Sequence, residues 1–192
     1  MTTRTTSPAI LPAIAQRWSP RAFDGSAVPQ ADLELIFEAA GLAPSAYNYQ
    51  PWTFLYAIKG DANWDAFLSL LIPFNASWAK EAGALVFIVS EKDMVQGEKV
   101  NPNHSHSFDA GAAWGYAALQ AKALGYDTHG MTGLDMGKAT AELAIPDTHR
   151  LEAAFVIGKA GDKAILPDFL QGREAPGTRK PVTEILRAGR FA

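Results

Sequence analysis

The sequence predicts an α+β protein, because helical and strand patterns follow one another without the regular βαβ alternation of a parallel sheet. Composition supports a folded chain: 48% of the 192 residues are hydrophobic and 19% are charged, which is enough apolar material for a sizeable core. The length suits one domain over residues 1–192, either alone or as a subunit of an intertwined assembly.

The first half of the chain is expected to mix helices and strands. Ser7 followed by Pro8 marks a helix start, and Pro20 disfavours helix in the residue before it. Apolar positions one turn apart indicate an amphipathic helix that Gly41 ends, and Asp61 caps a later helix. The expected elements are helix 9–16, extended segment 17–23, helix 30–40, strand 52–59, helix 61–71, short helix 77–81 and strand 84–90.

The second half opens with a polar stretch, residues 91–107, which has turn residues and no periodicity and is expected to be a lid or a tolerated loop. The helix after it is apolar nearly all round, so it is expected to be buried inside the fold or between subunits. Asp135 caps the next helix. The expected elements are helix 108–124, strand 126–129, loop 130–135, a helix from 135 that ends before Pro146, strand 151–160 and an irregular tail from 161.

Composition also excludes several kinds of site. The chain has no cysteine, which rules out disulfides, thiolate catalysis and Cys–zinc centres. A net charge of −3 argues against nucleic acid or an anionic membrane as the main partner. With neither a signal-peptide pattern nor a membrane-length apolar run, a cytoplasmic protein is expected. His104 and His106 form an H-x-H pair, but two solvated loop histidines are the favoured interpretation and no metal is assigned.

The segment "RWSPRAF" places Arg17, Ser19 and Arg21 at alternate positions. In an extended chain such residues point to one side. Two guanidiniums with a hydroxyl between them suit a phosphate or another electron-rich planar group. Surface decoration is the alternative interpretation of these three side chains.

Two later segments combine small and polar residues. "APSAYNYQPW" (residues 43–52) lets backbone groups approach a flat ligand closely, and an Asn/Ser/Pro-rich turn is the alternative. In "GMTGLD" (residues 130–135), Gly130 and Gly133 permit unusual backbone angles that would expose amide donors. A plain strand-to-helix loop is the alternative for that segment.

Together these segments resemble the FMN-dependent nitroreductases, in the same order along nearly the whole chain. "RWSPRAF" resembles the opening Arg-x-Ser-x-Arg/Lys-x-Phe segment of that family, and "LAPSAYNYQPW" its Ala-Pro-Ser-x-x-Asn-x-Gln-Pro-Trp segment. "DAGAAWGYAALQAKALGYDTHGMTGLD" is similar to the central helix and flavin loop, and "TRKPVTEIL" to the C-terminal Arg-x-Pro segment. The resemblance implies a central, mostly antiparallel sheet flanked by helices, in an intertwined homodimer with FMN at the subunit interface.

The resemblance also implies roles for individual residues. Arg17, Ser19 and Arg179 would face the FMN phosphate and ribityl chain, and a fixed cation at Arg21 would stabilise negative charge at the N1–O2 edge of the ring. The backbone around Thr132 and Gly133 would donate toward N5 and O4. The residues implied to contact the flavin from the other subunit are Pro44, Ser45, Ala46 and Asn48.

The activity implied is hydride transfer from NADH or NADPH through flavin N5 to a nitroaromatic, a quinone or a related acceptor, with the flavin rather than a side chain carrying the electrons. Tyr47, His104 and His106 are candidates for shaping the acceptor pocket. Trp114 stands where the family often has a polar residue, and packing in the dimer is favoured over a role in the pocket. The alternatives are a non-turnover flavin-binding protein and a flavin-dependent dehalogenase or flavin-breakdown relative.

Overall fold

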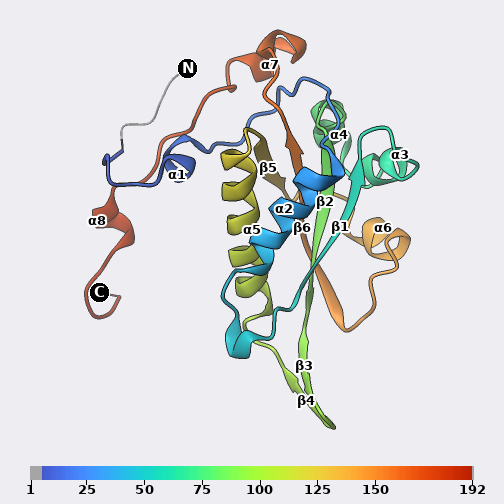
Figure 1. Cartoon of the computed structure of the whole chain (residues 1–192), viewed down its shortest axis with the longest axis vertical. Helices are drawn as coiled ribbons and strands as arrows, with labels where there is room; N and C mark the ends of the chain where they lie inside the picture. The colour runs from blue at the N-terminus through green and yellow to red at the C-terminus, as the bar shows by residue number, and fades with distance from the viewer. Residues whose placement is uncertain (1–5, 192) are drawn as a thin grey trace.

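The computed structural model describes residues 6–191 and contains a four-stranded sheet with helices on both faces (Figure 1). The strand order is β1-β2-β6-β5, and each neighbouring pair runs antiparallel. The predicted α+β class with an antiparallel sheet is therefore confirmed. The strands of the sheet are β1 (Trp52–Ile58), β2 (Ala84–Glu91), β5 (Asp127–Met131) and β6 (His149–Gly158).

Most of the predicted helices are present, and the two long ones agree closely with the sequence patterns. Asp135 caps α6 as predicted, because its side chain accepts a hydrogen bond of 3.0 Å from the backbone N–H of Lys138. The helices are α1 (Pro12–Gln16), α2 (Gln30–Gly41), α3 (Trp64–Leu68), α4 (Pro73–Ala79), α5 (His106–Ala123), α6 (Met136–Glu142), α7 (Asp168–Gln171) and α8 (Val182–Ile185).

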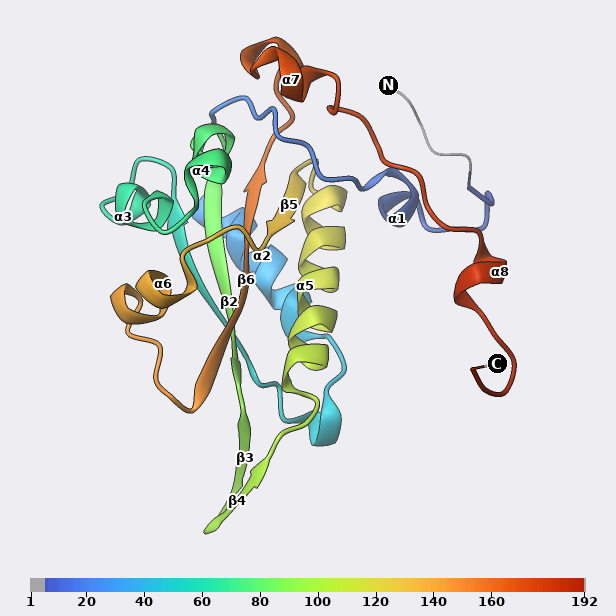
Figure 2. The same ribbon diagram turned by 180° about the vertical axis from the view of Figure 1, so that it is seen from behind.

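The core lies on both faces of the sheet, and β2 is buried on each of them. Leu85, Phe87 and Val89 pack in one cluster with residues of α3, α4 and α6. Val86 and Ile88 pack in the other with residues of α2 and α5. Figure 1 shows α2 in front of the sheet, and Figure 2 shows it behind. Burial on two sides explains why the sequence of β2 is continuously apolar rather than alternating.

Three predicted helix boundaries are wrong, and local hydrogen bonds show why. Pro12, rather than Pro8, occupies the first turn of α1, and residues 7–10 form a turn before it. Asp61 closes the turn after β1 by accepting from the backbone N–H groups of Ile58 and Asn63, so α3 begins later than expected and stops at Leu68. The short helix expected at 77–81 begins at residue 73 instead, where a proline again starts it.

The polar stretch 91–107 contains a hairpin that the sequence analysis missed. Strands β3 (Asp93–Gln96) and β4 (Lys99–Pro102) pair antiparallel and project from one end of the sheet (Figure 1). Gly97 takes a φ of +62° at the turn, where glycine is favoured. Both strands are largely exposed, so neither face required apolar residues and no alternation marked them.

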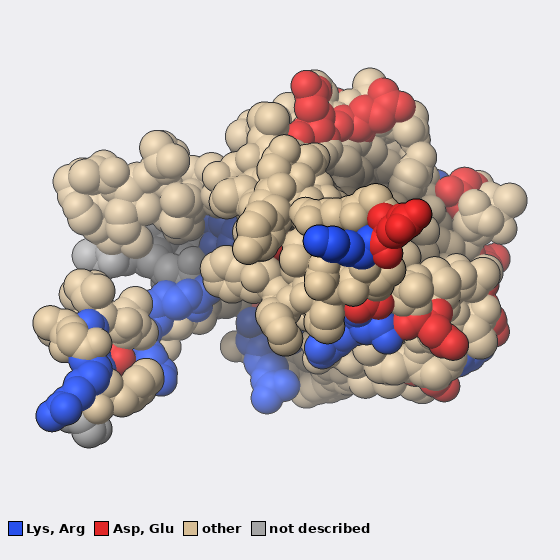
Figure 3. All heavy atoms as spheres, turned by 90° about the horizontal axis from the view of Figure 1, so that it is seen from below, with Lys and Arg blue, Asp and Glu red and all other residues tan. Residues whose placement is uncertain are grey.

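The chain after β6 leaves the body as an arm. In both ribbon views the arm runs beside α1, and α8 lies away from the sheet (Figures 1 and 2). Apolar side chains on it are exposed at Val182, Ile185, Leu186 and Phe191. Lys and Arg side chains also gather on the projecting part of the molecule (Figure 3). No helix in residues 6–191 is long and apolar enough to cross a membrane.

Candidate cofactor site

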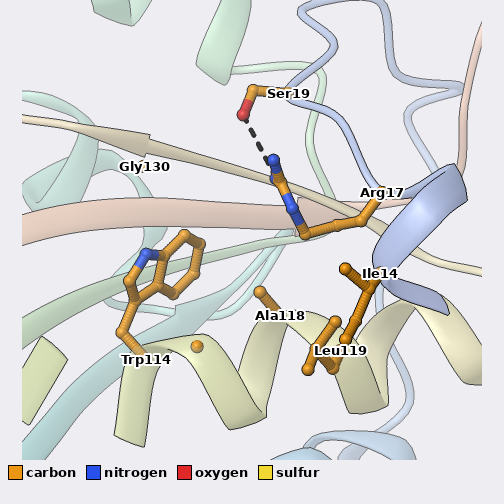
Figure 4. A pocket seen from close by; sticks show the side chains of 8 residues that line it. Ile14, Arg17, Ser19, Trp114, Ala118, Leu119 and Gly130 are labelled. Atoms are coloured by element: carbon orange, nitrogen blue, oxygen red, sulfur yellow. Dashed lines mark hydrogen bonds between the residues drawn. The ribbon is translucent and has the colours of Figure 1, made fainter. Parts of the chain in front are cut away.

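Two adjoining pockets open beside α5 and the sheet. Their volumes are about 500 Å³ and about 300 Å³, within the range of small-molecule sites. Trp114 and Gly130 line both pockets, so the two lie side by side; we call them together the trough, and the larger pocket is drawn in Figure 4. The other lining residues are Ile14, Arg17, Ser19, Gly115, Ala118 and Leu119 in the larger pocket and Ile88, Met131, Thr132, Ala153, Ala154 and Phe155 in the smaller.

One end of the trough is polar and cationic. The Nη1 atom of Arg17 donates to the carbonyl of Trp18 at 3.1 Å and to Oγ of Ser19 at 3.4 Å, as Figure 4 shows for the second contact. Arg17 directly follows α1, which packs against α5, so the end of this short helix fixes where the guanidinium lies. A guanidinium beside a hydroxyl is a donor set suited to phosphate.

Arg21 does not line the trough with Arg17 and Ser19. The chain bends at Arg21, and the backbone N–H groups of Arg21 and Ala22 both donate to Oε1 of Glu174, at 2.7 and 2.8 Å. The Arg21 guanidinium lies 5.9 Å from the Trp78 ring centroid, and its Nε is buried without a hydrogen-bond partner. Glu174, on the C-terminal arm, therefore holds the chain at this bend.

His129 lies against the same segment and was not found by sequence reasoning. Its Nδ1 donates to the carbonyl of Pro20 at 2.8 Å, and its ring stacks on Trp78 with centroids 4.6 Å apart. Burial is the main cause that lowers the pKa of His129; the hydrogen bond to Pro20 opposes it, and the positive charges of Arg21 and Arg17 lower the pKa further. This site therefore holds a neutral imidazole next to two cations.

The middle of the trough is apolar and includes two aromatic rings. The Trp114 ring packs on Phe155 with centroids 4.4 Å apart and rises from α5 toward the strand that carries Gly130 (Figure 4). A Cβ atom on Gly130 would lie 3.2 Å from the Trp114 ring, so a side chain here would press on the ring, and glycine lets Trp114 pack closely against the strand. Trp114 thus shapes the pocket within one protomer, which is the alternative that the sequence analysis did not favour.

The loop after β5 brings Thr132 to the trough, where it is exposed and lines the smaller pocket. Neither Gly130 nor Gly133 adopts a positive φ, so the predicted reason for these glycines is wrong. A Cβ on Gly133 would lie 2.5 Å from Nδ2 of Asn75, whose side chain donates to the Gly133 carbonyl at 2.9 Å. Close contact with α4, and not unusual backbone geometry, explains this glycine.

The "PSAYN" segment lies elsewhere in the protomer. The backbone N–H of Ala46 donates to Oδ2 of Asp109 at 3.0 Å, near the first turn of α5. Tyr47 and Asn48 have φ near +55°, and Tyr47 is 83% exposed. None of the residues 44–48 lines the trough, so one protomer does not bring Pro44, Ser45, Ala46 or Asn48 to Arg17.

The remaining candidates are also apart from the trough lining. Arg179 lies exposed on the arm, where its Nη1 donates to the carbonyls of Gly177 and Thr178. His104 is exposed before α5, whereas His106 begins that helix and contacts Oγ of Ser90 at 2.7 Å. The two histidines therefore have different surroundings, which corrects the expectation of two solvated loop residues.

Comparison with known proteins shows which family the chain belongs to. A sequence profile of the nitroreductase family matches residues 14–159, which is more than half of the chain. A comparison with curated proteins gives no match. The fold and the sequence together define a nitroreductase-like α+β protein, and the chain belongs to the nitroreductase family.

Solved structures agree with this assignment. One described as an oxidoreductase containing FMN is 44% identical, with a TM-score of 0.95 over 100% of this chain and 99% of its own. A putative nitroreductase in complex with FMN from Desulfovibrio desulfuricans is 25% identical, with a TM-score of 0.74 over 97% of this chain and 100% of its own. A putative nitroreductase in complex with FMN from Exiguobacterium sibiricum, 24% identical, shares the fold with a TM-score of 0.76 over 98% of this chain and 100% of its own.

Proposed function

We propose that this chain is an FMN-dependent oxidoreductase that accepts two electrons from NADH or NADPH and passes them to a small acceptor such as a nitroaromatic or a quinone. The observation that carries the proposal is the trough, which has a guanidinium and a hydroxyl at one end and an apolar wall with aromatic rings further along. This combination fits a phosphate joined to a planar ring system. The 44% identical oxidoreductase containing FMN supports the choice of this cofactor.

In this proposal the residues of the site have different roles toward the cofactor. Arg17 and Ser19 bind the phosphate, and the Trp114 wall and Thr132 border the ring. FMN, when bound, supplies the hydride chemistry, so the protein has to bind, orient and tune it. Arg21, whose buried Nε has no hydrogen-bond partner within the protomer, is assigned to the N1–O2 edge, and Gly133 supports the loop that would donate toward N5 and O4.

We further propose that the working unit is a homodimer. Asp109, which holds the "PSAYN" segment, lies nine residues from Ala118 in the trough lining, or about 14 Å along α5. A second protomer would be needed to bring Pro44, Ser45, Ala46 and Asn48, with Tyr47 beside them, to the cofactor. The outward side of α5 offers a surface for such contact, because Phe108 is 81% exposed and Tyr116 is 44% exposed.

The arm completes the proposed site. Arg179 would reach the phosphate only if the arm were held against a trough, and its exposed apolar residues would need to be covered. We expect Phe108→Asp to lower both the dimer fraction in light scattering and FMN retention. A yellow, active monomer would refute the shared-site proposal.

An absorbance experiment tests the function directly. Purified protein is expected to carry a yellow cofactor that mass spectrometry identifies as FMN, and anaerobic NADH or NADPH should bleach it. Adding a nitroaromatic or a quinone should restore the colour. FAD at full occupancy would refute the choice of FMN, and a yellow colour unaffected by both nucleotides would indicate a flavin-binding protein without turnover.

A further inference from the structure

A second polar group of side chains lies on the α5 face of the sheet, and the proposed function does not use it. Oγ of Ser90 is 2.7 Å from Nδ1 of His106 and donates to Oε1 of Glu152 at 2.6 Å. Oγ of Ser107 donates to the same carboxylate oxygen at 2.7 Å. Ser90 is fully buried, and the His106 and Glu152 side chains are 17% and 15% exposed. We call these four residues the Ser–His–Glu cluster.

A β-bulge explains how Glu152 reaches this position. Ile88 pairs with Ala153, but the next residue of β2, Val89, pairs with Leu151, so Glu152 is the extra residue on β6. Bulges re-aim a side chain without ending the strand pairing. Here the extra residue carries a carboxylate beside the first turn of α5, where negative charge is favoured by the helix dipole.

The cluster adjoins the trough. Ile88 and Ala153 both line the smaller pocket. Ser90 follows Ile88 on the same face of β2, because residues two apart in a strand share a face and are separated by about 7 Å. Glu152 directly precedes Ala153. None of the four cluster residues lines the trough itself, but Ser90 and Glu152 are close in the chain to two residues, Ile88 and Ala153, that do.

The directions of the hydrogen bonds around Ser90 show which ring nitrogen of His106 carries the proton. The single hydroxyl proton of Ser90 is donated to Glu152, so Ser90 can only accept from His106, and Nδ1 carries the proton. The other ring nitrogen, Nε2, is then the atom that takes up and releases a proton.

Few other charges face this ring. Nε of Arg150, on β6, lies 3.5 Å from Oε2 of Glu152, the oxygen that the two serines do not use. Asp109, one turn further along α5, directs its carboxylate to the backbone N–H of Ala46. Glu152 is thus the acidic group that the described contacts couple to His106, directly at 3.4 Å and through Ser90.

We propose that the Ser–His–Glu cluster donates a proton to the acceptor during its reduction. The inference rests on the proposed function. NADH or NADPH supplies two electrons and one proton as a hydride equivalent, and a two-electron reduction of the acceptor consumes one further proton. His106 releases that proton from Nε2 through water at the end of the trough and regains one from solvent. His106 and Glu152 are positioning and proton-transfer residues, because the reacting atoms lie beyond Ile88 and Ala153.

The decisive variant is His106→Asn, which keeps a donor for Ser90 but carries no exchangeable charge. We expect turnover with a quinone to fall about 10- to 100-fold, in the lower range of general acid catalysis, and the histidine limb of the kcat–pH profile to disappear. FMN affinity and the thermal midpoint should stay near wild-type values. His149→Asn is the matched control, since that ring contacts Thr148 and lines a separate pocket with residues of the opposite core face.

A second measurement needs no turnover. NMR titration of the cofactor-free protein follows the His106 ring signal and reports whether this ring exchanges a proton with solvent. A His106→Asn enzyme with an unchanged pH profile, or a His106 ring that does not titrate, would overturn the proposal. Failure of wild-type protein to oxidise NADH or NADPH would instead refute the proposed function, and this proposal with it.

Discussion

Replacing Gly133 by alanine should destabilise the protein, because the loop beside the trough has no room for a Cβ atom. That atom would lie 2.5 Å from Nδ2 of Asn75 and 2.8 Å from Cδ1 of Ile72. Asn75 is 8% exposed, and moving it would break its hydrogen bond to the Gly133 carbonyl. Overpacking costs about 1–3 kcal/mol and the lost bond about 1 kcal/mol, so the expected loss is about 2–4 kcal/mol.

Urea denaturation of cofactor-free protein, followed by tryptophan fluorescence, measures this loss. For a chain of this length the thermal midpoint should fall by about 5–15 °C. Gly137→Ala is the matched control: its Cβ would meet only Oδ1 of Asp135, at 3.7 Å, and alanine favours the α6 helix by up to about 1 kcal/mol. If Gly133→Ala is as stable as Gly137→Ala, the packing explanation of this glycine is wrong.

Three further predictions concern the cofactor segment and the core. Arg17→Ala should weaken FMN binding about 10- to 100-fold through the loss of a charge-assisted contact, whereas exposed Lys163→Ala should leave the fluorescence titration unchanged. Glu174→Ala removes the acceptor of two backbone N–H groups and should weaken FMN binding about 10-fold; an unaltered Kd would contradict its role in holding the segment. Burial and the hydrogen bond to Asp32 raise the pKa of Tyr126 to about 12, so this contribution to stability is complete below pH 10 and is lost as the pH rises through 12. Tyr126→Phe should flatten that alkaline loss in urea titrations between pH 9 and 12.

Local sequence signals were sufficient for much of the fold. Leu33, Ile36 and Ala40 recur with helical spacing and are the buried residues of α2. The apolar run of β2 identified the doubly buried strand, and Asp135 identified the start of α6. These features depend on residues close in the chain, where spacing and capping act directly. The order of four short segments was also enough to indicate the family that the profile confirms.

Other local signals were ambiguous, because a residue pattern can indicate the conformation of a segment without showing which distant residues contact it. Strict alternation predicted that Arg21 would face the same way as Arg17 and Ser19, but the chain bends at Arg21, where Glu174 holds it, and Arg21 does not line the trough. The two residues that meet at this bend are 153 positions apart. The hairpin at 93–102 was not predicted from the sequence, because two exposed strands need no apolar pattern.

The sequence by itself therefore determined the class of fold, the long helices, the buried strands and the two residues, Arg17 and Ser19, that meet at the polar end of the trough. The tertiary structure alone decided how the trough is shaped. Trp114 and Gly130 must be side by side, and Glu152 must be displaced by a bulge toward Ser90. These arrangements follow from packing between distant elements and from strand register. The spacing of neighbouring residues in the sequence predicts neither of them.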